Sequence, residues 1–127
     1  MKPTGKILII DDDDSIRHLI SFRLKRFDYT VLTAESGEKG WEFIRRYHPD
    51  LVLLDYNMPD MNGYDVLKKI RESDEPAVKK TKVLMLTAMN SINDIQPILK
   101  LKVSGYIVKP FNMYELIEKI EPLMPKG

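Results

Sequence analysis

In the segment KILIIDDDDSIR, residues 6–17, a short apolar run is followed directly by four consecutive aspartates. The continuous apolar segment at 7–10 is typical of a strand that is buried on both faces of a sheet. A helical pattern of apolar residues begins directly after the aspartates. Neighbouring carboxylates repel one another, and burial strengthens the repulsion. The four carboxylates therefore need a nearby cation or must point in different directions.

The same alternation of apolar runs and amphipathic stretches continues along the chain. The apolar runs predict strands at 6–10, 30–34, 51–55, 82–86 and 105–109. Apolar residues at helical spacing predict five helices, at 15–27, 36–47, 64–72, 91–101 and 112–120. We expect an α/β fold, in which a parallel sheet carries helices on both faces and the crossovers are right-handed.

Two segments depart from this regular pattern. The stretch 71–81 has little periodicity and is expected to be an exposed connection. Pro97 falls within the fourth helical pattern, and proline fits poorly in a helix interior. It is expected either in the first turn or at a kink.

Composition limits the classes of protein to consider. The chain has 127 residues, of which 43% are hydrophobic and 31% charged, so we expect one soluble globular domain over 1–127. The absence of cysteine excludes disulfides, thiolate metal sites and a thiol nucleophile. The net charge of +1 does not favour binding to nucleic acid or to a membrane surface. No apolar stretch approaches the roughly 20 residues of a membrane span. We expect a cytoplasmic protein that is monomeric.

Polar residues gather where the predicted strands end. Asp11 and Asp12 follow the first strand, Asp55 ends the third, Thr87 follows the fourth and Lys109 ends the fifth. Open α/β sheets bind ligands beyond the carboxyl ends of their strands. Crowded carboxylates suit Mg²⁺, which takes oxygen ligands, and a lysine suits a phosphoryl oxygen. Because a carboxylate can form an aspartyl-phosphate, these residues predict a Mg²⁺-dependent phosphoryl acceptor site.

This interpretation divides the four aspartates into two pairs. Asp11 and Asp12 are expected to face the metal ion. Asp13 and Asp14 lie at the start of the next helix, where carboxylates can cap free N–H groups and meet the positive end of the helix dipole. The alternative is that all four form a solvated acidic loop.

The segments ILIIDDD, PDLVLLDYNMPDMNGYDVL, VLMLTA and YIVKPF resemble the receiver domain of two-component response regulators when taken together in this order. The resemblance covers essentially the whole chain and is nearest to single-domain regulators of the chemotaxis type. It implies a flavodoxin-like fold with a five-stranded parallel sheet in the order 2-1-3-4-5.

The resemblance also implies roles for individual residues around a Mg²⁺ cofactor. Asp55 would be the phosphoacceptor and a metal ligand. Asp12 would bind the metal directly, Asp11 through water or by orienting the site, and Asn57 through its backbone carbonyl. Thr87 would be the switch hydroxyl that turns toward the phosphoryl group.

Other implied roles lie near the fifth strand and in the third loop. Lys109 would pair with a phosphoryl oxygen and precede Pro110 through a cis peptide bond. Tyr106 would be the switch aromatic. Gly63 is expected in a turn that needs a positive φ angle. Lys102 is a departure, because the family usually has glycine at that position.

The implied function is a phosphoaspartate switch that helps to catalyse its own phosphorylation and dephosphorylation and is not otherwise an enzyme. Its partners would be a sensor histidine kinase or histidine phosphotransfer protein and a downstream protein target, with no direct contact to nucleic acid or membrane. Kinase choice is expected to depend on first-helix surface residues such as Arg17, Ser21 and Leu24.

Two alternatives remain open from the sequence. The chain could be the receiver module of a longer regulator, for example a DNA-binding one. It could also be a Mg²⁺-dependent phosphatase with an aspartate nucleophile on the first strand. Against the phosphatase, no acidic pair follows Lys109, and there is no cap insertion.

Overall fold

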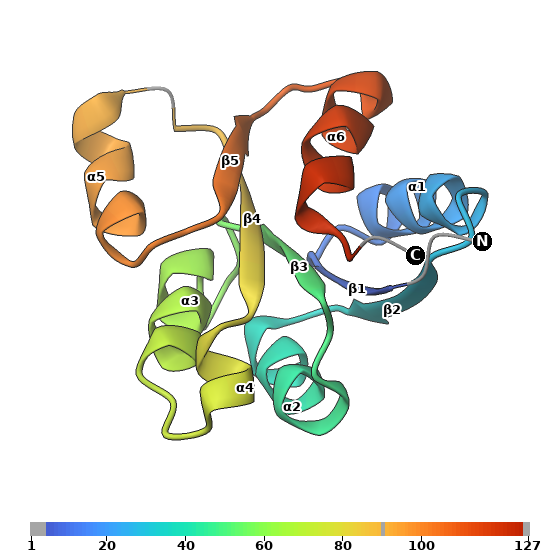
Figure 1. Cartoon of the computed structure of the whole chain (residues 1–127). Helices are drawn as coiled ribbons and strands as arrows, with labels where there is room; N and C mark the ends of the chain where they lie inside the picture. The colour runs from blue at the N-terminus through green and yellow to red at the C-terminus, as the bar shows by residue number, and fades with distance from the viewer. Residues whose placement is uncertain (1–4, 90, 126–127) are drawn as a thin grey trace.

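A computed structural model describes residues 5–89 and 91–125 and contains one parallel sheet (Figure 1). Its strands are paired in the order β2-β1-β3-β4-β5. Their bounds are Lys6–Ile10 (β1), Thr30–Ala34 (β2), Leu51–Asp55 (β3), Lys82–Thr87 (β4) and Gly105–Val108 (β5). All four pairings are parallel, so every carboxyl end meets the same edge of the sheet. The predicted strand order is confirmed.

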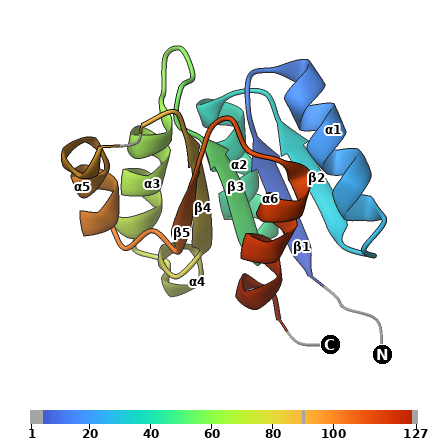
Figure 2. The ribbon, with the colours of Figure 1, turned by 90° about the horizontal axis from the view of Figure 1, so that it is seen from above.

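The helices lie in two layers, one on each face of the sheet (Figure 2). One layer holds α1 (Asp14–Lys25) and α6 (Met113–Ile120), and a 3₁₀ turn, Glu121–Leu123, follows α6. The other layer is formed by α2 (Gly37–Tyr47), α3 (Gly63–Arg71), α4 (Pro76–Lys79) and α5 (Ile92–Lys100). None of the helices within residues 5–89 and 91–125 is long and apolar enough to span a bilayer.

Two apolar clusters fill the space between the sheet and its layers. Successive strand residues point to opposite faces, so Ile7 and Ile9 pack toward α1 and α6, whereas Leu8 and Ile10 pack toward α2 and α3. All residues of β3 are buried. The continuous apolar runs in the sequence arise because both faces of the central strands are covered.

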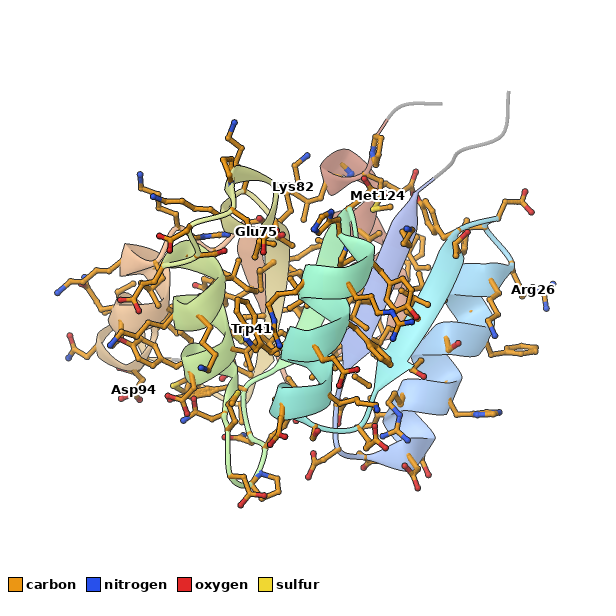
Figure 3. The ribbon with its side chains drawn as sticks, turned by 90° about the horizontal axis from the view of Figure 1, so that it is seen from below. Arg26, Trp41, Glu75, Lys82, Asp94 and Met124 are labelled. Atoms are coloured by element: carbon orange, nitrogen blue, oxygen red, sulfur yellow. The ribbon has the colours of Figure 1, made fainter. Side chains whose placement is uncertain are left out.

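Trp41, a residue of α2, lies between α2 and α3 (Figure 3). Its indole is partly buried against the cluster on that face. The Nζ atom of Lys69 lies 5.9 Å from the ring centroid, and the Cζ atom of Arg45 lies 5.1 Å from it. Arg45 belongs to α2 and Lys69 to α3, so cations from both helices lie near the ring and the indole joins the two helices.

Polar side chains set the starts of several helices. The Asp13 carboxylate caps α1 by accepting a hydrogen bond from the Ile16 N–H at 3.1 Å, and Asp14 occupies the first turn. Asn112 caps α6 through the Glu115 N–H at 2.8 Å. The division of the four aspartates is therefore confirmed for the second pair, which serves α1.

The structure shows the conformation of the two segments that depart from the regular sequence pattern, 71–81 and the helix that contains Pro97. The stretch 71–81, expected to be a connection only, contains the one-turn helix α4, which begins at Pro76. Proline suits this first position because its missing N–H would have no helical partner there. The prediction of five helices was therefore one short. Pro97 lies in the second turn of α5, beyond the first turn, and cannot donate a hydrogen bond to the preceding turn.

Arg71, the last residue of α3, ties three segments together. Its Nε donates to the Leu101 carbonyl at 2.8 Å, and its Nη2 donates to the Lys102 carbonyl at 2.9 Å. Its Nη1 donates to the carbonyls of Lys79 at 3.0 Å and Thr81 at 2.7 Å. Burial lowers the pKa of Arg71 below its ordinary value. The guanidinium thus satisfies carbonyls at the ends of α4 and α5 and at the entry to β4.

Lys102 follows α5 with a φ angle of +56°, in the left-handed region that favours glycine. We expect Lys102→Gly to raise the free energy of unfolding by about 0.5–1 kcal/mol, because the left-handed conformation costs a non-glycine residue roughly 1–2 kcal/mol and the chain entropy of glycine offsets part of that gain. Urea denaturation at pH 7 measures the change. Lys100→Gly is the matched control and should lower stability, since Lys100 lies within α5. A loss of stability in both variants would contradict the argument.

Candidate functional site

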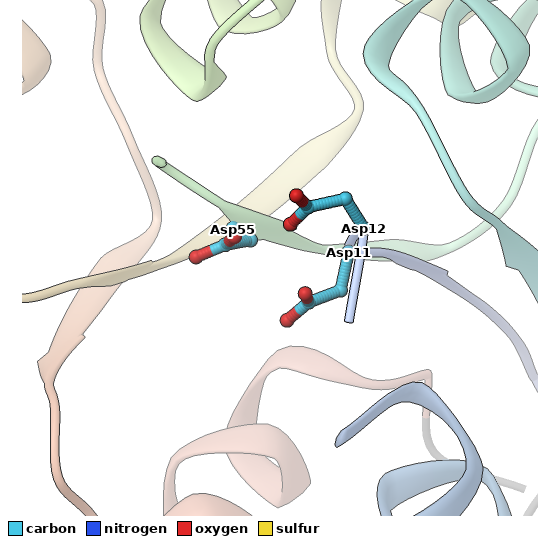
Figure 4. A group of neighbouring side chains, drawn as sticks. All are labelled: Asp11, Asp12 and Asp55. Atoms are coloured by element: carbon cyan, nitrogen blue, oxygen red, sulfur yellow. The ribbon is translucent and has the colours of Figure 1, made fainter. Parts of the chain in front are cut away.

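Three carboxylates meet at the carboxyl edge of the sheet (Figure 4). Asp11 follows β1 and Asp55 ends β3, and these strands are neighbours in the sheet. Asp11, Asp12 and Asp55 each offer an oxygen, and these three oxygens lie within 4.8 Å of one another. Asp11 and Asp55 are buried, with 1% and 2% of their surface exposed, whereas Asp12 is exposed. This arrangement can hold a divalent cation.

Asp11 has one satisfied and one unsatisfied carboxylate oxygen. Its Oδ1 accepts a hydrogen bond from the Asp13 N–H at 2.9 Å. Its Oδ2 is buried and has no hydrogen-bond partner among the described residues. The pKa of Asp11 is raised from 3.8 to about 6, mainly by burial. A buried carboxylate oxygen without a donor suits a cation ligand, because a bound cation would satisfy it.

Lys109 provides the positive charge of the site. Its Nζ lies 2.6 Å from Oδ1 of Asp55. Burial raises the pKa of Asp55, and the hydrogen bond and charge of Lys109 oppose that shift. The backbone N–H of Lys109 donates to the Thr87 carbonyl at 2.7 Å, and its peptide bond to Pro110 is cis. The residue that follows β5 thus brings its ammonium group to the Asp55 carboxylate.

The remaining predicted site residues lie around this centre. Thr87 is fully buried, and its hydroxyl accepts a hydrogen bond from the Met89 N–H at 3.0 Å. Among the described residues, no hydrogen bond joins Thr87 to Asp55. Tyr106 is partly buried, and both Tyr106 and Met89 pack against the apolar cluster between the sheet and α2 and α3. A backbone hydrogen bond from Asn57 lowers the pKa of Asp55, so this residue also borders the site.

Gly63 supports the site in a different way from that expected. The prediction of a positive φ angle was wrong, since Gly5 is the only glycine with one among the described residues. A Cβ atom at Gly63 would lie 2.8 Å from the Cα of Tyr56 and 2.9 Å from the carbonyl oxygen of Asp55. Close approach of α3 to the end of β3 therefore requires glycine here.

The expected kinase-facing surface of α1 also needs correction. Leu24 and Ser21 are buried, at 0% and 9% exposure, because their positions on α1 face the sheet. The Arg17 side chain is 18% exposed and folds back over the β1–α1 loop. The apolar residues that α1 does expose are Leu19 and Phe22, at 53% and 58%.

A family model described as the response regulator receiver domain matches residues 7–121. The chain is a member of this family. The resemblance found in the sequence motifs is therefore confirmed over most of the chain.

The receiver domain is similar to the probable transcriptional regulator ycf27 of Porphyridium aerugineum, with 41% identity over 120 residues. That match covers 94% of this chain and 48% of the relative. The cell cycle response regulator CtrA of Brucella ovis is 37% identical over 122 residues, covering 96% of this chain and 51% of that protein. The chain thus spans about half the length of these relatives.

Among solved structures, the receiver domain is similar to the chemotaxis response regulator CheY4 of Vibrio cholerae. The TM-score is 0.88 at 31% identity, and the match covers 95% of this chain and 99% of that one. The flavodoxin-like fold implied by the sequence is thus confirmed.

The receiver domain without metal should gain stability when Asp11 becomes asparagine. The pKa of Asp11 in the folded chain, about 6, lies above its ordinary value of 3.8, so ionisation of this carboxyl destabilises the fold above that pH range. An asparagine side chain in its place is neutral at every pH. We expect Asp11→Asn to raise the free energy of unfolding by on the order of 1–3 kcal/mol at pH 7.5.

This difference should shrink as the pH falls through 6, because the native carboxyl then takes up a proton in the folded state. Urea denaturation in the presence of a chelator at pH 7.5 and pH 5 measures both values. Asp74→Asn, at an exposed position, is the control. An Asp11→Asn variant less stable than the native chain at pH 7.5 would contradict this account.

Proposed function

We propose that the chain is a phosphorylation-dependent signalling switch in which Asp55 accepts a phosphoryl group. The observation that carries the proposal is the contact of the Lys109 ammonium with Asp55, at 2.6 Å, beside two further carboxylates. An acidic cluster alone would fit a passive cation site. A lysine at the acceptor oxygen also provides a cation for the transferred group.

The proposed step is a displacement at phosphorus. A carboxylate oxygen of Asp55 forms an O–P bond, and the P–N bond of a phosphohistidine breaks. The electron pair of that bond returns to the imidazole of the donor, a sensor kinase or phosphotransfer protein. Lys109 then moves its charge from the carboxylate to a phosphoryl oxygen. The chain thereby assists its own phosphorylation, and hydrolysis of the acyl phosphate restores Asp55.

The donor set fits Mg²⁺. Asp11, Asp12 and Asp55 would hold it with the backbone carbonyl of Asn57, and their oxygens are the ligands that this ion prefers. When bound, the ion neutralises carboxylate charge and polarises the phosphoryl oxygens. The unsatisfied Oδ2 of Asp11 supports this assignment.

Phosphorylation would act on the neighbouring switch residues. The hydroxyl of Thr87 could exchange its bond with the Met89 N–H for one to the phosphoryl group. Tyr106, which packs against the same apolar cluster as Met89, would then change its position. The expected result is a changed surface on α5, β5 and α6, where a downstream protein would bind.

The test is the intact mass of the chain after incubation with acetyl phosphate and Mg²⁺. We expect the gain of one phosphoryl group, its loss when a chelator is added first, and its location on the peptide that contains Asp55. No gain in mass although the chain is folded and binds Mg²⁺ would overturn the proposal. Uptake that is unaffected by the chelator would overturn the role of the metal.

A second candidate is that this receiver domain is one module of a longer transcriptional regulator. Relatives with that description are about twice as long as the match. The downstream step would then be DNA binding by another module. Sequencing the reading frame beyond codon 127 tests this directly: a DNA-binding module would support it, and a stop codon would contradict it.

A further inference from the structure

Arg17 reaches back from the second turn of α1 to the loop that carries the acidic cluster. Its Nη1 donates to the backbone carbonyl of Asp11 at 2.7 Å, and its Nη2 pairs with the Asp14 carboxylate. Only 18% of the Arg17 side chain is exposed, whereas 89% of the Asp14 side chain is exposed. The Asp11 contact is therefore the buried part of this interaction.

The carbonyl held by Arg17 belongs to the peptide unit that joins Asp11 to Asp12. A peptide unit is planar, so fixing its oxygen also fixes the direction in which the chain enters Asp12. The other bonds of Asp11 run from its own N–H to the Ala34 carbonyl at 3.1 Å and from the Asp13 N–H to its Oδ1 at 2.9 Å. The first bond holds the peptide unit before Asp11 and the second holds its side chain, whereas the Arg17 bond holds the peptide unit between Asp11 and Asp12.

Asp12 depends on this restraint more than the other carboxylates do. Its side chain is exposed, and among the described residues no hydrogen bond or ion pair holds its carboxylate. Asp55 is held by Lys109, and Asp11 is held by the Asp13 N–H. The three carboxylates repel one another, so without a backbone restraint Asp12 would turn toward solvent.

We propose that Arg17 is a positioning residue for the divalent cation, because it fixes the peptide that carries Asp11 and Asp12. This inference rests on the proposed Mg²⁺ site. Groups that orient metal ligands typically change metal affinity by 10–100-fold when they are removed. We expect the dissociation constant for Mg²⁺ to rise about tenfold in Arg17→Met, which keeps an unbranched apolar side chain but loses the donors.

Charge alone predicts the opposite change in Mg²⁺ affinity when Arg17 is removed. Arg17 is a cation near the cluster, and removing it would strengthen the attraction of Mg²⁺ to the carboxylates. The sign of the change in affinity therefore separates positioning from long-range electrostatics. Arg17→Lys keeps the charge but offers a compact ammonium in place of the planar fork, so it should weaken binding by about threefold, an intermediate loss.

The experiment is a calorimetric titration of the metal-free chain with Mg²⁺, for the native protein, Arg17→Met, Arg17→Lys and the control Arg23→Met. Arg23 is an exposed cation on the same helix, and its removal should change the dissociation constant by less than about twofold. Far-ultraviolet circular dichroism at the titration temperature verifies that each variant is folded. Unchanged or tighter Mg²⁺ binding in Arg17→Met would overturn the inference. If that variant does not fold, unchanged binding in Arg17→Lys would overturn it.

A second readout separates this inference from the proposed function. The Mg²⁺ concentration for half-maximal labelling by acetyl phosphate should rise about tenfold in Arg17→Met, while labelling at saturating Mg²⁺ returns to within about twofold of the native rate. Labelling that stays low at saturating Mg²⁺ would contradict a pure positioning role. If the native chain binds Mg²⁺ but takes up no phosphoryl group, the proposed function fails and the titration still tests Arg17.

Discussion

Replacement of Asp55 by asparagine is expected to abolish the Mg²⁺-dependent uptake of a phosphoryl group from acetyl phosphate. The amide keeps the shape of the side chain but is a far weaker nucleophile than the carboxylate. Asp55 is buried with a raised pKa, so removal of its charge should not destabilise the fold. Lys109, whose side chain is 24% exposed, can turn its ammonium group to water.

Intact mass spectrometry of the native chain and Asp55→Asn, treated in parallel, measures this effect. The control Asp74→Asn changes an exposed carboxylate outside the cluster and should be labelled like the native chain. Uptake by Asp55→Asn at the native level would mean that another group is the acceptor, and the proposed assignment would then be wrong. Melting temperatures of both variants distinguish a chemical effect from unfolding.

Arg71→Met is expected to lower the free energy of unfolding by about 3 kcal/mol. The variant keeps the apolar stem of the side chain but leaves four carbonyl groups without the guanidinium donors. Hydrogen bonds from a charged donor contribute more than neutral ones, although water can replace part of them at helix ends. The lost cation also faced the negative ends of α4 and α5.

Urea denaturation at pH 7 tests this value. Arg71→Lys should recover less than half of the loss, because an ammonium group cannot reproduce a planar fork that donates in several directions. Lys68→Met, on the exposed side of the same helix, is the control and should stay within about 0.5 kcal/mol of the native chain. A loss below about 1 kcal/mol in Arg71→Met would show that the four carbonyls are satisfied by water.

The strands and most helices could be predicted because they carry a local signal. Ile7 to Ile10 form an uninterrupted apolar run, which indicates a strand covered on both faces, and Asn112 precedes Glu115 at capping distance. The strand order was a consequence of the family resemblance. The location of Asp11, Asp55 and Lys109 at one edge followed from parallel strands, whose carboxyl ends meet there.

Contacts between distant backbone groups could not be predicted in this way. Arg71 hydrogen-bonds to the Leu101 and Lys102 carbonyls, about 30 residues away. Every residue has a backbone carbonyl, so the residue types at these positions do not indicate the contact. The spacing of Asp14 and Arg17 suggests a helix-surface ion pair, but it does not reveal the bond to the Asp11 carbonyl. The tight approach at Gly63 was likewise hidden, since a turn with a positive φ angle and a close backbone contact both call for glycine.

The helix α5 combines several features that weaken a helix on its own. Ser91 makes no capping hydrogen bond with its side chain, Pro97 removes a bond from the second turn, and Lys102 follows in a strained conformation. Burial of Ile95 and Ile98, together with the hydrogen bond from Arg71 to the Leu101 carbonyl, offsets these losses. Native proteins open in separate cooperative units, and a unit held by few contacts opens at a small fraction of the global free energy. Detachment of α5 as one body should therefore precede opening of the sheet. Under the proposed switch, phosphorylation of Asp55 would then displace this element at a small cost in free energy.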